Sequence, residues 1–543
     1  MGWIDHIFLG MQAVFLGPAG VSVLGFDIPI AVLTVLGGFI TGILVGATPG
    51  LAGPMAMAIA LPILISVFGY HEAALLPVFG FLIGIMKGAT VGGAVPAILF
   101  NTPGTPDAYM TTLDGHPMAQ RGEAERALRV AHFSSASGDT FSDVVLILCA
   151  PFLAILVEGY LDLPEKAALL ILSMTFIAAV IGSSPGKGLM SVGLGLLAAY
   201  IGTGEDFTPR LTMGNEALAQ GFSVVSAVLG VLIVGEIFTA IQNMRREGVQ
   251  SVHEHRHAQQ RVRIDKVLLK RLAPYIARSA VIGSAIGALP GVGSTLAATL
   301  GYSTARARHA RRVAAEADAD VANRERLVPF GAGAPEGIAA TEAANSSVSG
   351  ANLIPVLSLG IPGNAAAVFL ILAADSIGGF NPGPSVFRLS GDGTNPELVI
   401  AFGLFTMMMV ANVLNWVIGG RVMRAMGVMT RVPRHILLPI VLLLTLTAVY
   451  VQETRLAVVW FTLGFGVLGY AMRRVGMSPL PFVIAFILGG RLEETSRQAF
   501  SATGSDPWFL FSSVTSTVLM LLALMTVVLT LYYRSRDAAR HGS

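Results

Sequence analysis

Charged residues are scarce in this sequence of 543 residues. Asp, Glu, Lys and Arg make up 13% of it, about half of the roughly 25% that soluble proteins carry. Hydrophobic residues make up 54%, and the mean hydropathy is +0.70. This composition excludes an ordinary soluble enzyme and a disordered chain. Because 35 Lys and Arg nearly balance 33 Asp and Glu, the net charge does not attract a polyanion, and this excludes nucleic acid as a partner.

Cysteine is almost absent. The single cysteine, Cys149, cannot form an internal disulfide or a thiolate metal cluster. It lies in the apolar run 144–157, where we expect a small buried hydrophobic residue. His253, His255 and His257 alternate in a basic segment, but three histidines in a loop make a poor closed site. We therefore expect no metal site and no cofactor.

Long apolar runs, glycine and proline are abundant instead. The 62 Gly and 28 Pro suit membrane helices that pack closely and break where needed. Runs of the length that crosses a bilayer recur at 7–25, 29–48, 51–68, 73–100, 141–157, 167–183, 187–202, 221–241, 279–303, 347–373, 398–420, 436–451, 456–472 and 508–533, with a shorter run at 478–490. The first residues lack the basic segment of a cleavable signal, so the first run is expected to be a membrane helix. The sequence predicts an all-α polytopic membrane protein with about 12 or more transmembrane segments.

The distribution of Lys and Arg predicts the orientation of these segments. Most of these residues fall in the segments 105–140, 242–278, 304–328, 421–435 and 534–543, with others at Lys187, Arg473 and Arg474. The positive-inside rule places these segments and the C-terminus in the cytoplasm.

The run 279–303 does not fit a single crossing of the membrane. Basic segments flank both of its ends, and the positive-inside rule places both of these segments in the cytoplasm. Its middle carries Pro290-Gly291-Val292-Gly293. We predict a re-entrant hairpin that enters and leaves from the cytoplasm, with a tilted and kinked single span as the alternative.

An internal repeat relates the two halves of the chain. The segment GILVGATPGLAG at 42–53 recurs as GSAIGALPGVGS at 283–294, a separation of 241 positions. Pro96 and Pro103-Gly104 match Pro355 and Pro362-Gly363 at a separation of 259, so the second half has gained a net insertion, which 304–328 can supply. Few charges surround the first copy and many surround the second. We therefore predict two inverted repeats with re-entrant or broken helices.

The repeat also sets the expected division of the chain. We expect a first half at 1–140 with broken segments 38–62 and 88–106, completing helices at 141–241, a basic cytoplasmic loop at 242–278, a second repeat at 279–400 with broken segments 279–303 and 346–366, C-terminal helices at 401–533, and a cytoplasmic tail at 534–543.

Paired Gly/Pro breaks in inverted repeats indicate a secondary transporter with its site near the membrane midplane. Each break exposes N–H groups that favour an anion and carbonyls that favour a small cation. Small residues that serve only helix packing are the alternative, although packing would not need the prolines.

Candidate site residues frame these breaks. A carboxylate held by hydroxyl, amide and backbone N–H donors avoids the cost of burying several bare arginines. We predict substrate contacts at Asn101, Thr102, Pro103, Gly104, Thr105, Pro362, Gly363, Asn364 and Lys87, and cation contacts at Pro49, Gly50, Pro290, Gly291, Gly293, Asn345, Ser346 and Ser358.

Ionisable residues inside apolar runs are functional candidates by default. Lys87 could attract a carboxylate, neutralise a buried acid such as Glu336 or Glu342, or reach the interface as a snorkelling lysine. The two glutamates could coordinate a cation or close a structural ion pair, and we favour the structural role for Glu336.

At these residues the sequence resembles the large membrane subunit of tripartite tricarboxylate transporters, the TctA family. The strongest match runs from Gly333 to Ile371 and contains the family's LGIPG at 359–363. Further matching blocks lie at 42–53, 97–128, 209–214, 235–238 and 478–500, so the resemblance covers most of the chain in order. One departure is that the family reads Ala-Asn-Asn after the Glu-Ala, whereas in this chain Asn345-Ser346-Ser347 follow Ala344, so the role of the second Asn passes to a serine hydroxyl or is lost.

The resemblance implies the transport channel of a three-part system in the bacterial inner membrane. It implies a small membrane subunit (TctB-like) and a periplasmic solute-binding protein (TctC-like) that delivers an organic di- or tricarboxylate. Uptake would be driven by an ion gradient, with Na⁺ favoured over H⁺ as coupling cation, and without ATP hydrolysis.

Other functions are weighed against this one. Gly186-Lys187-Gly188 does not complete a phosphate loop, because no Ser or Thr follows the lysine. A carboxylate channel and a binding-protein-independent carrier remain alternatives. An intramembrane enzyme would need a paired catalytic constellation that the sequence does not display, so the chain is expected not to be an enzyme.

Overall fold

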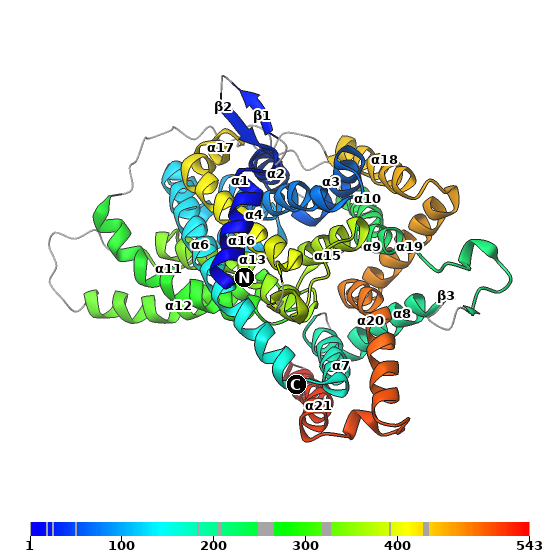
Figure 1. The fold of residues 1–543 in the computed structure, drawn as a ribbon. Coiled ribbons are helices and arrows are strands. Elements are labelled where there is room, and N and C mark those ends of the chain that lie inside the picture. Colours follow the sequence, from blue (N-terminus) through cyan, green and yellow to red (C-terminus); the bar gives the residue numbers. More distant parts are fainter. Residues whose placement is uncertain are drawn as a thin grey trace.

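The structure is a computed structural model that describes residues 2–17, 20–23, 26–48, 51–181, 184–203, 208–247, 265–317, 327–389, 393–426 and 434–541. Helices dominate these residues, and the strands among them form two short antiparallel hairpins (Figure 1). A helix pairs its peptide groups internally, which a chain in lipid requires. The predicted all-α polytopic class is confirmed.

The N-terminal elements end with the longest helix of the described chain. They are α1 (Trp3–Phe15), β1 (Gly20–Val23), β2 (Phe26–Pro29), α2 (Ile30–Gly46), α3 (Gly53–Phe68), η1 (Glu72–Ala74), α4 (Leu75–Phe100), η2 (Pro106–Ala108), α5 (Tyr109–Gln120) and α6 (Ala124–Tyr160). Strands β1 and β2 pair with Gly20 opposite Pro29. Helix α6 has 37 residues, and the expected boundary at 140/141 falls inside it.

A second group of elements leads to the middle of the chain. It contains α7 (Leu163–Val180), α8 (Pro185–Tyr200), β3 (Gly202–Thr203), β4 (Pro209–Arg210), η3 (Glu216–Leu218), α9 (Val224–Val228), the π-helical η4 (Leu229–Val234) and α10 (Gly235–Glu247). Because α10 reaches Glu247 and α11 begins at Lys266, helix occupies both ends of the segment 242–278 that we expected to be a loop. His253, His255 and His257 lie outside the described residues.

The remaining elements contain the second copy of the repeat and the C-terminal helices. They are α11 (Lys266–Gly287), α12 (Ser294–Ala317), α13 (Pro335–Ala351), α14 (Leu353–Leu359), α15 (Ala365–Ile377), η5 (Pro384–Phe387), α16 (Pro396–Leu414), the π-helical η6 (Asn415–Gly419), α17 (Gly420–Ala425), α18 (Arg434–Glu453), α19 (Leu456–Arg474), α20 (Leu480–Ala502), η8 (Phe509–Phe511) and α21 (Val514–His541). Helices α11 and α12 lie at one side of the molecule, and α8, α19 and α20 lie at the other (Figure 1).

Among the described residues, seven helices are long and apolar enough to cross a membrane. They are 72–100, 124–160, 163–180, 224–242, 396–425, 456–474 and 514–532, and shorter apolar helices lie at 30–46, 53–68, 365–377 and 438–453. The short helices α2, α3 and α15 adjoin the predicted breaks, so the Gly/Pro segments account for their length.

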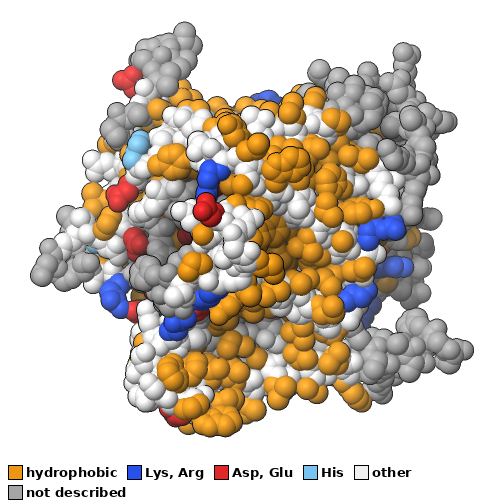
Figure 2. All heavy atoms as spheres, turned by 90° about the vertical axis from the view of Figure 1, so that its right-hand side faces the viewer, with side chains coloured by type: hydrophobic (Ala, Val, Ile, Leu, Met, Phe, Trp, Pro, Cys, Tyr) orange, Lys and Arg blue, Asp and Glu red, His pale blue; other side chains and the backbone are white. Residues whose placement is uncertain are grey.

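Much of the outer surface is apolar, as Figure 2 illustrates for one face. On α6, Leu148 is 68% and Phe152 69% exposed, and Trp460 on α19 is 66% exposed. Soluble monomers rarely expose such extended apolar patches, so these faces are suited to lipid. Cys149 is also exposed, and our expectation of a buried cysteine is wrong because α6 turns this side of the run outward.

The two halves repeat the same helix contacts. Glycines of α2 pack on α4, where a Cβ on Gly42 would collide with the Ile85 carbonyl oxygen. Glycines of α11 pack on α13 in the same way, where a Cβ on Gly283 would collide with the Ala344 carbonyl oxygen. The glycines are 241 positions apart and their partners 259, the two separations of the sequence repeat. The repeat is therefore present in the packing, and the opposite orientation of its halves stays a prediction.

Helices α11 and α12 form a hairpin around the segment 288–293. They pack against one another, and the turn between them contains a hydrogen bond from the Leu289 N–H to the Ile286 carbonyl (3.0 Å). This arrangement fits a hairpin better than a kinked single span. Because α12 continues to Ala317, the first part of the Arg-rich segment 304–328 is helix, and the side from which the hairpin enters stays a prediction.

Candidate functional site

Two helix ends in the repeat have the same backbone geometry. Helix α4 ends at Asn101 (φ 54°), and the Thr102 N–H donates to the Pro96 carbonyl (3.3 Å). Helix α14 ends at Gly360 (φ 70°), and the Ile361 N–H donates to the Pro355 carbonyl (3.1 Å). A left-handed residue directly after the last helical turn is a common way of ending a helix, and in both halves the next N–H reaches the proline carbonyl six positions back. Both breaks therefore stop a helix at matching positions of the repeat.

The breaks of each half meet one another. In the first half the Gly104 N–H donates to the Gly93 carbonyl (3.3 Å), and a Cβ on Gly104 would collide with the Gly46 carbonyl oxygen. In the second half the Gly291 N–H donates to the Gly363 carbonyl (2.9 Å), and Gly291 has φ 82°. Glycine is needed at Gly104 for space and at Gly291 for its left-handed backbone.

The predicted substrate residues of the first break differ in exposure. Asn101 is exposed, and Thr102 and Pro103 are partly buried. The Thr102 hydroxyl donates to the Phe100 carbonyl (3.2 Å). Thr105 is 7% exposed, and its Oγ1 has no hydrogen-bond partner among the described residues. Thr105 is thus the side chain of this break with an unused donor.

The predicted residues of the second half mostly bond to nearby backbone. The Asn364 Oδ1 accepts from the Ala367 N–H (2.9 Å) and caps α15, and the Ser358 hydroxyl donates to the Ile354 carbonyl of its own helix. Pro362 and Gly363 are buried, Pro290 is partly buried and Gly293 is exposed. Pro49 and Gly50 lie outside the described residues.

Helix α13 and its C-cap residue contribute buried amides without partners among the described residues. Asn345 and Asn352 are each 2% exposed, and neither side chain has a hydrogen-bond partner among the described residues. Ser349 lies between them at spacings of four and three, so the three residues share one face of the helix. The neighbouring Ser346 hydroxyl lies 2.6 Å from that of Ser135 on α6. Buried polar groups are nearly always paired, so two unpaired amides on one face call for an explanation.

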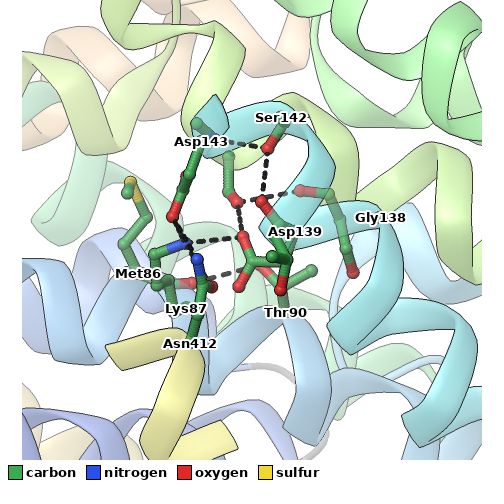
Figure 3. A network of polar contacts seen from close by, with 12 residues as sticks. Met86, Lys87, Thr90, Gly138, Asp139, Ser142, Asp143 and Asn412 are labelled. Carbon is green, nitrogen blue, oxygen red and sulfur yellow. Dashed lines mark hydrogen bonds and ion pairs between the residues drawn. The ribbon is translucent and has the colours of Figure 1, made fainter. Parts of the chain in front are cut away.

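A buried charged network joins α4, α6 and α16 (Figure 3). The Lys87 ammonium has no exposed surface and donates to Asp139 Oδ1 (2.7 Å), Asp143 Oδ2 (2.7 Å) and Asn412 Oδ1 (3.2 Å). The Asn412 Nδ2 in turn donates to Asp143 Oδ2 (2.7 Å), and the Ser349 hydroxyl donates to Asp139 Oδ1. All three ammonium protons therefore have acceptors.

This network leaves one carboxylate oxygen unpaired. Asp143 Oδ1 has no hydrogen-bond partner among the described residues and lies against Gly350, where a Cβ would collide with it. One ammonium and two carboxylates give a net charge of −1 when all are ionised. Through Ser349, the network reaches the α13 face that carries Asn345 and Asn352. Carboxylate oxygens of the network and amide oxygens of this face could therefore together bind a further cation.

The two buried glutamates have partners other than Lys87. Glu336 pairs with Arg271, which supports a structural role for Glu336. Glu342 accepts from the Thr111 hydroxyl, and its Oε2 has no partner among the described residues. Lys87 pairs with neither glutamate, because α6 brings Asp139 and Asp143 to it.

Sequence reasoning missed Asp139, Asp143 and Asn412. Ser135, Asp139 and Ser142 do recur at spacings of four and three, the period of one helix face, which is a signal for a polar face but not for the residues that pair with it. It was obscured because the arginines of 105–140 placed the whole segment among the loops. The structure instead makes 124–160 one helix with a buried polar face.

Comparison with known proteins places this chain in a family. The model described as the tripartite tricarboxylate transporter TctA family matches residues 32–484. An uncharacterized 52.8 kDa protein in the TAR-I ttuC' 3' region of Agrobacterium vitis is 29% identical over 519 residues, 94% of this chain and 95% of that protein. An uncharacterized protein in the TAR-II ttuC' 3' region of the same organism is 30% identical over 249 residues, 46% of this chain and 93% of that protein. No solved structure matches.

Proposed function

We propose a function from one premise: the chain belongs to the tripartite tricarboxylate transporter TctA family. It is therefore a membrane-embedded component of a tricarboxylate transporter. We propose that it is the permease subunit, which takes up organic di- or tricarboxylates as a secondary transporter driven by an ion gradient. The observation that carries this proposal is the family match over residues 32–484.

The proposed assembly has two partners. A periplasmic solute-binding protein (TctC-like) would deliver the carboxylate, and a small membrane subunit (TctB-like) would complete the complex in the bacterial inner membrane. The excess of Lys and Arg in the segments between spans supports a cytoplasmic C-terminus.

We place the substrate at the two helix breaks. Matching left-handed helix ends at Asn101 and Gly360 are each followed by irregular backbone, which membrane proteins tolerate where it lines a site or is buried in protein. The unpaired Thr105 hydroxyl is suited to donate to a carboxylate. Lys87 has no spare donor in this conformation, so we assign it to the coupling network and not to direct substrate contact.

We place the coupling cation between that network and the α13 face. The unpaired oxygens of Asp143, Asn345 and Asn352 support this placement, because carboxylate, amide and carbonyl oxygens are ligands for Na⁺ in secondary transporters. The family's second Asn corresponds to Ser346, whose hydroxyl is engaged by Ser135, so the amides of Asn345 and Asn352 are the better candidates. Na⁺ is favoured over H⁺ on the same grounds.

Counterflow tests the class of mechanism. Vesicles containing this chain and its two partners are loaded with excess unlabelled citrate and diluted into labelled citrate. A carrier transiently accumulates label by exchange. A channel only equilibrates it, and an enzyme converts it chemically; either result would contradict the proposal.

A further inference from the structure

A pocket of about 490 Å³ lies between α6 and the continuous helix 396–425, apart from the repeat breaks. Three arginines, a histidine and two aromatic residues line most of it: Arg129, His132, Phe133, Trp416, Arg421 and Arg424. The transport function proposed above uses none of these side chains.

The pocket is built by a local irregularity of the helix 396–425. Its π-helical segment η6 ends in Gly419, and Gly420 follows. A Cβ on Gly420 would lie 3.0 Å from His132 Nδ1, so glycine lets this ring approach without crowding. The other ring nitrogen, Nε2, lies 3.0 Å from the Asn415 carbonyl oxygen. π-Helical turns of this kind are frequent at functional sites.

The charge of the pocket is unbalanced. Arg421 and Arg424 are three residues apart and lie on one face of the helix, where like charges repel. Neither forms an ion pair with Asp or Glu in the described part of the chain, whereas Arg129 pairs with Glu125 (2.6 Å). Arginine forks match the oxygens of a phosphate group, so a bound phosphate would relieve the repulsion.

The surroundings of the pocket are apolar and exposed. Trp416 is 42%, Val417 58% and Val413 59% exposed on the helix 396–425, and Phe141 is 39% exposed on α6. Both helices are candidate membrane spans. A tryptophan next to arginines at the end of an exposed apolar strip is typical of the membrane–water interface. A free phosphate would use the arginines alone, whereas a phospholipid would use both the arginines and the strip.

We propose that this pocket binds the headgroup phosphate of an anionic phospholipid, with the acyl chains lying along the exposed faces of α6 and helix 396–425. Basic pockets between membrane helices bind such headgroups. Arg421 and Arg424 would hold the phosphate, and Trp416 would contact the glycerol and the upper acyl chain.

The test uses the full chain, purified in detergent and stripped of lipid. Dioleoyl phosphatidylglycerol, dioleoyl phosphatidylcholine and inorganic phosphate are each titrated, with native mass spectrometry and thermal stabilisation as readouts. We expect Arg421→Gln/Arg424→Gln to weaken phosphatidylglycerol binding by about 25-fold, since each basic residue near an anionic lipid contributes about fivefold. The matched control is Arg308→Gln/Arg311→Gln, which removes the same charge from exposed positions of α12 outside the pocket.

Selective loss of phosphatidylglycerol binding in the pocket variant, with the α12 control unchanged, supports the proposal. Equal loss in the control would overturn it, because bulk charge would then explain the affinity. Equal binding of inorganic phosphate, or of phosphatidylcholine, would also overturn it. The single Arg424→Gln substitution at an exposed position should weaken binding about fivefold, and it keeps the test decisive if the double variant does not fold.

Discussion

The buried charges around Lys87 give the most demanding prediction. In Lys87→Met the apolar side chain nearly fills the space of the lysine stem, but Asp139 and Asp143 lose their cation in a buried site. Removing one partner of a buried ion pair costs about 3–5 kcal/mol. Because one substitution here orphans two carboxylates, we expect a loss of stability in the upper part of that range.

Removing all three charges together should restore most of the stability that Lys87→Met loses. In Lys87→Met/Asp139→Asn/Asp143→Asn no uncompensated charge stays buried, and exchanging a buried ion pair for neutral groups is often close to neutral in stability. The control is Lys166→Met, whose pair with Glu158 spans 3.3 Å and is partly exposed; such pairs contribute about 0–1 kcal/mol.

Heating the detergent-purified variants and measuring the fraction that stays monodisperse gives their order of stability. We expect wild type and Lys166→Met to be close, Lys87→Met far below, and the triple variant between them. A triple variant no more stable than Lys87→Met, or a Lys87→Met variant as stable as the control, would refute the reasoning. Since the network is also the proposed coupling site, the triple variant should fold and yet lose ion-driven uptake.

Three further predictions concern the breaks and the helix ends. Gly104→Ala should cost about 1–3 kcal/mol of packing strain and reduce uptake more than Gly363→Ala. The Cβ of Ala at 104 would collide with the Gly46 carbonyl oxygen, whereas the Cβ of Ala at 363 would lie 3.1 Å from the Asn352 carbonyl oxygen. Equal uptake in both variants would contradict this asymmetry. Asn345→Ala removes a buried amide without a partner, so stability should stay level or rise by about 1 kcal/mol while the half-saturating Na⁺ concentration rises severalfold; unchanged Na⁺ dependence would remove Asn345 from the cation site. Burial raises the pKa of the Asp114 carboxyl above its ordinary value although three backbone N–H groups donate to it, so its contribution to stability is fully present at low pH and is lost as the pH rises through the folded-state pKa. Asp114→Asn should remove this part of the pH dependence of the melting temperature, and a wild-type-like pH profile in the variant would contradict the assignment.

The breaks of the repeat could be predicted because their signals are local. Pro96 and Pro355, at matching positions, lie inside apolar runs, and the carbonyl of each accepts a hydrogen bond from the N–H that follows a left-handed helix end. A glycine needed for close approach, such as Gly104, is also visible as a residue type before any contact is known. The sequence could therefore locate the helix ends and the positions where backbone meets backbone.

The charged network could not be predicted in the same way, because its pairs join distant parts of the chain. Lys87 and Asn412 meet through tertiary packing, and no local pattern distinguishes Asp139 from the glutamates that we considered. Glu336 and Arg271 likewise belong to different helices. The exposure of Cys149 depends on which side of α6 faces outward, which an apolar run without periodic polar residues does not reveal.

Gradient-driven uptake in reconstituted vesicles tests the central claim most directly. The chain is reconstituted alone, with the small subunit, and with both the small subunit and the citrate-loaded binding protein, under an inward Na⁺ gradient, an inward H⁺ gradient or neither. The account predicts concentrative citrate uptake with all three components and an inward Na⁺ gradient, and little uptake without the partners or without the gradient. Concentrative uptake by the chain alone, or uptake by the full system that is indifferent to both gradients, would contradict it.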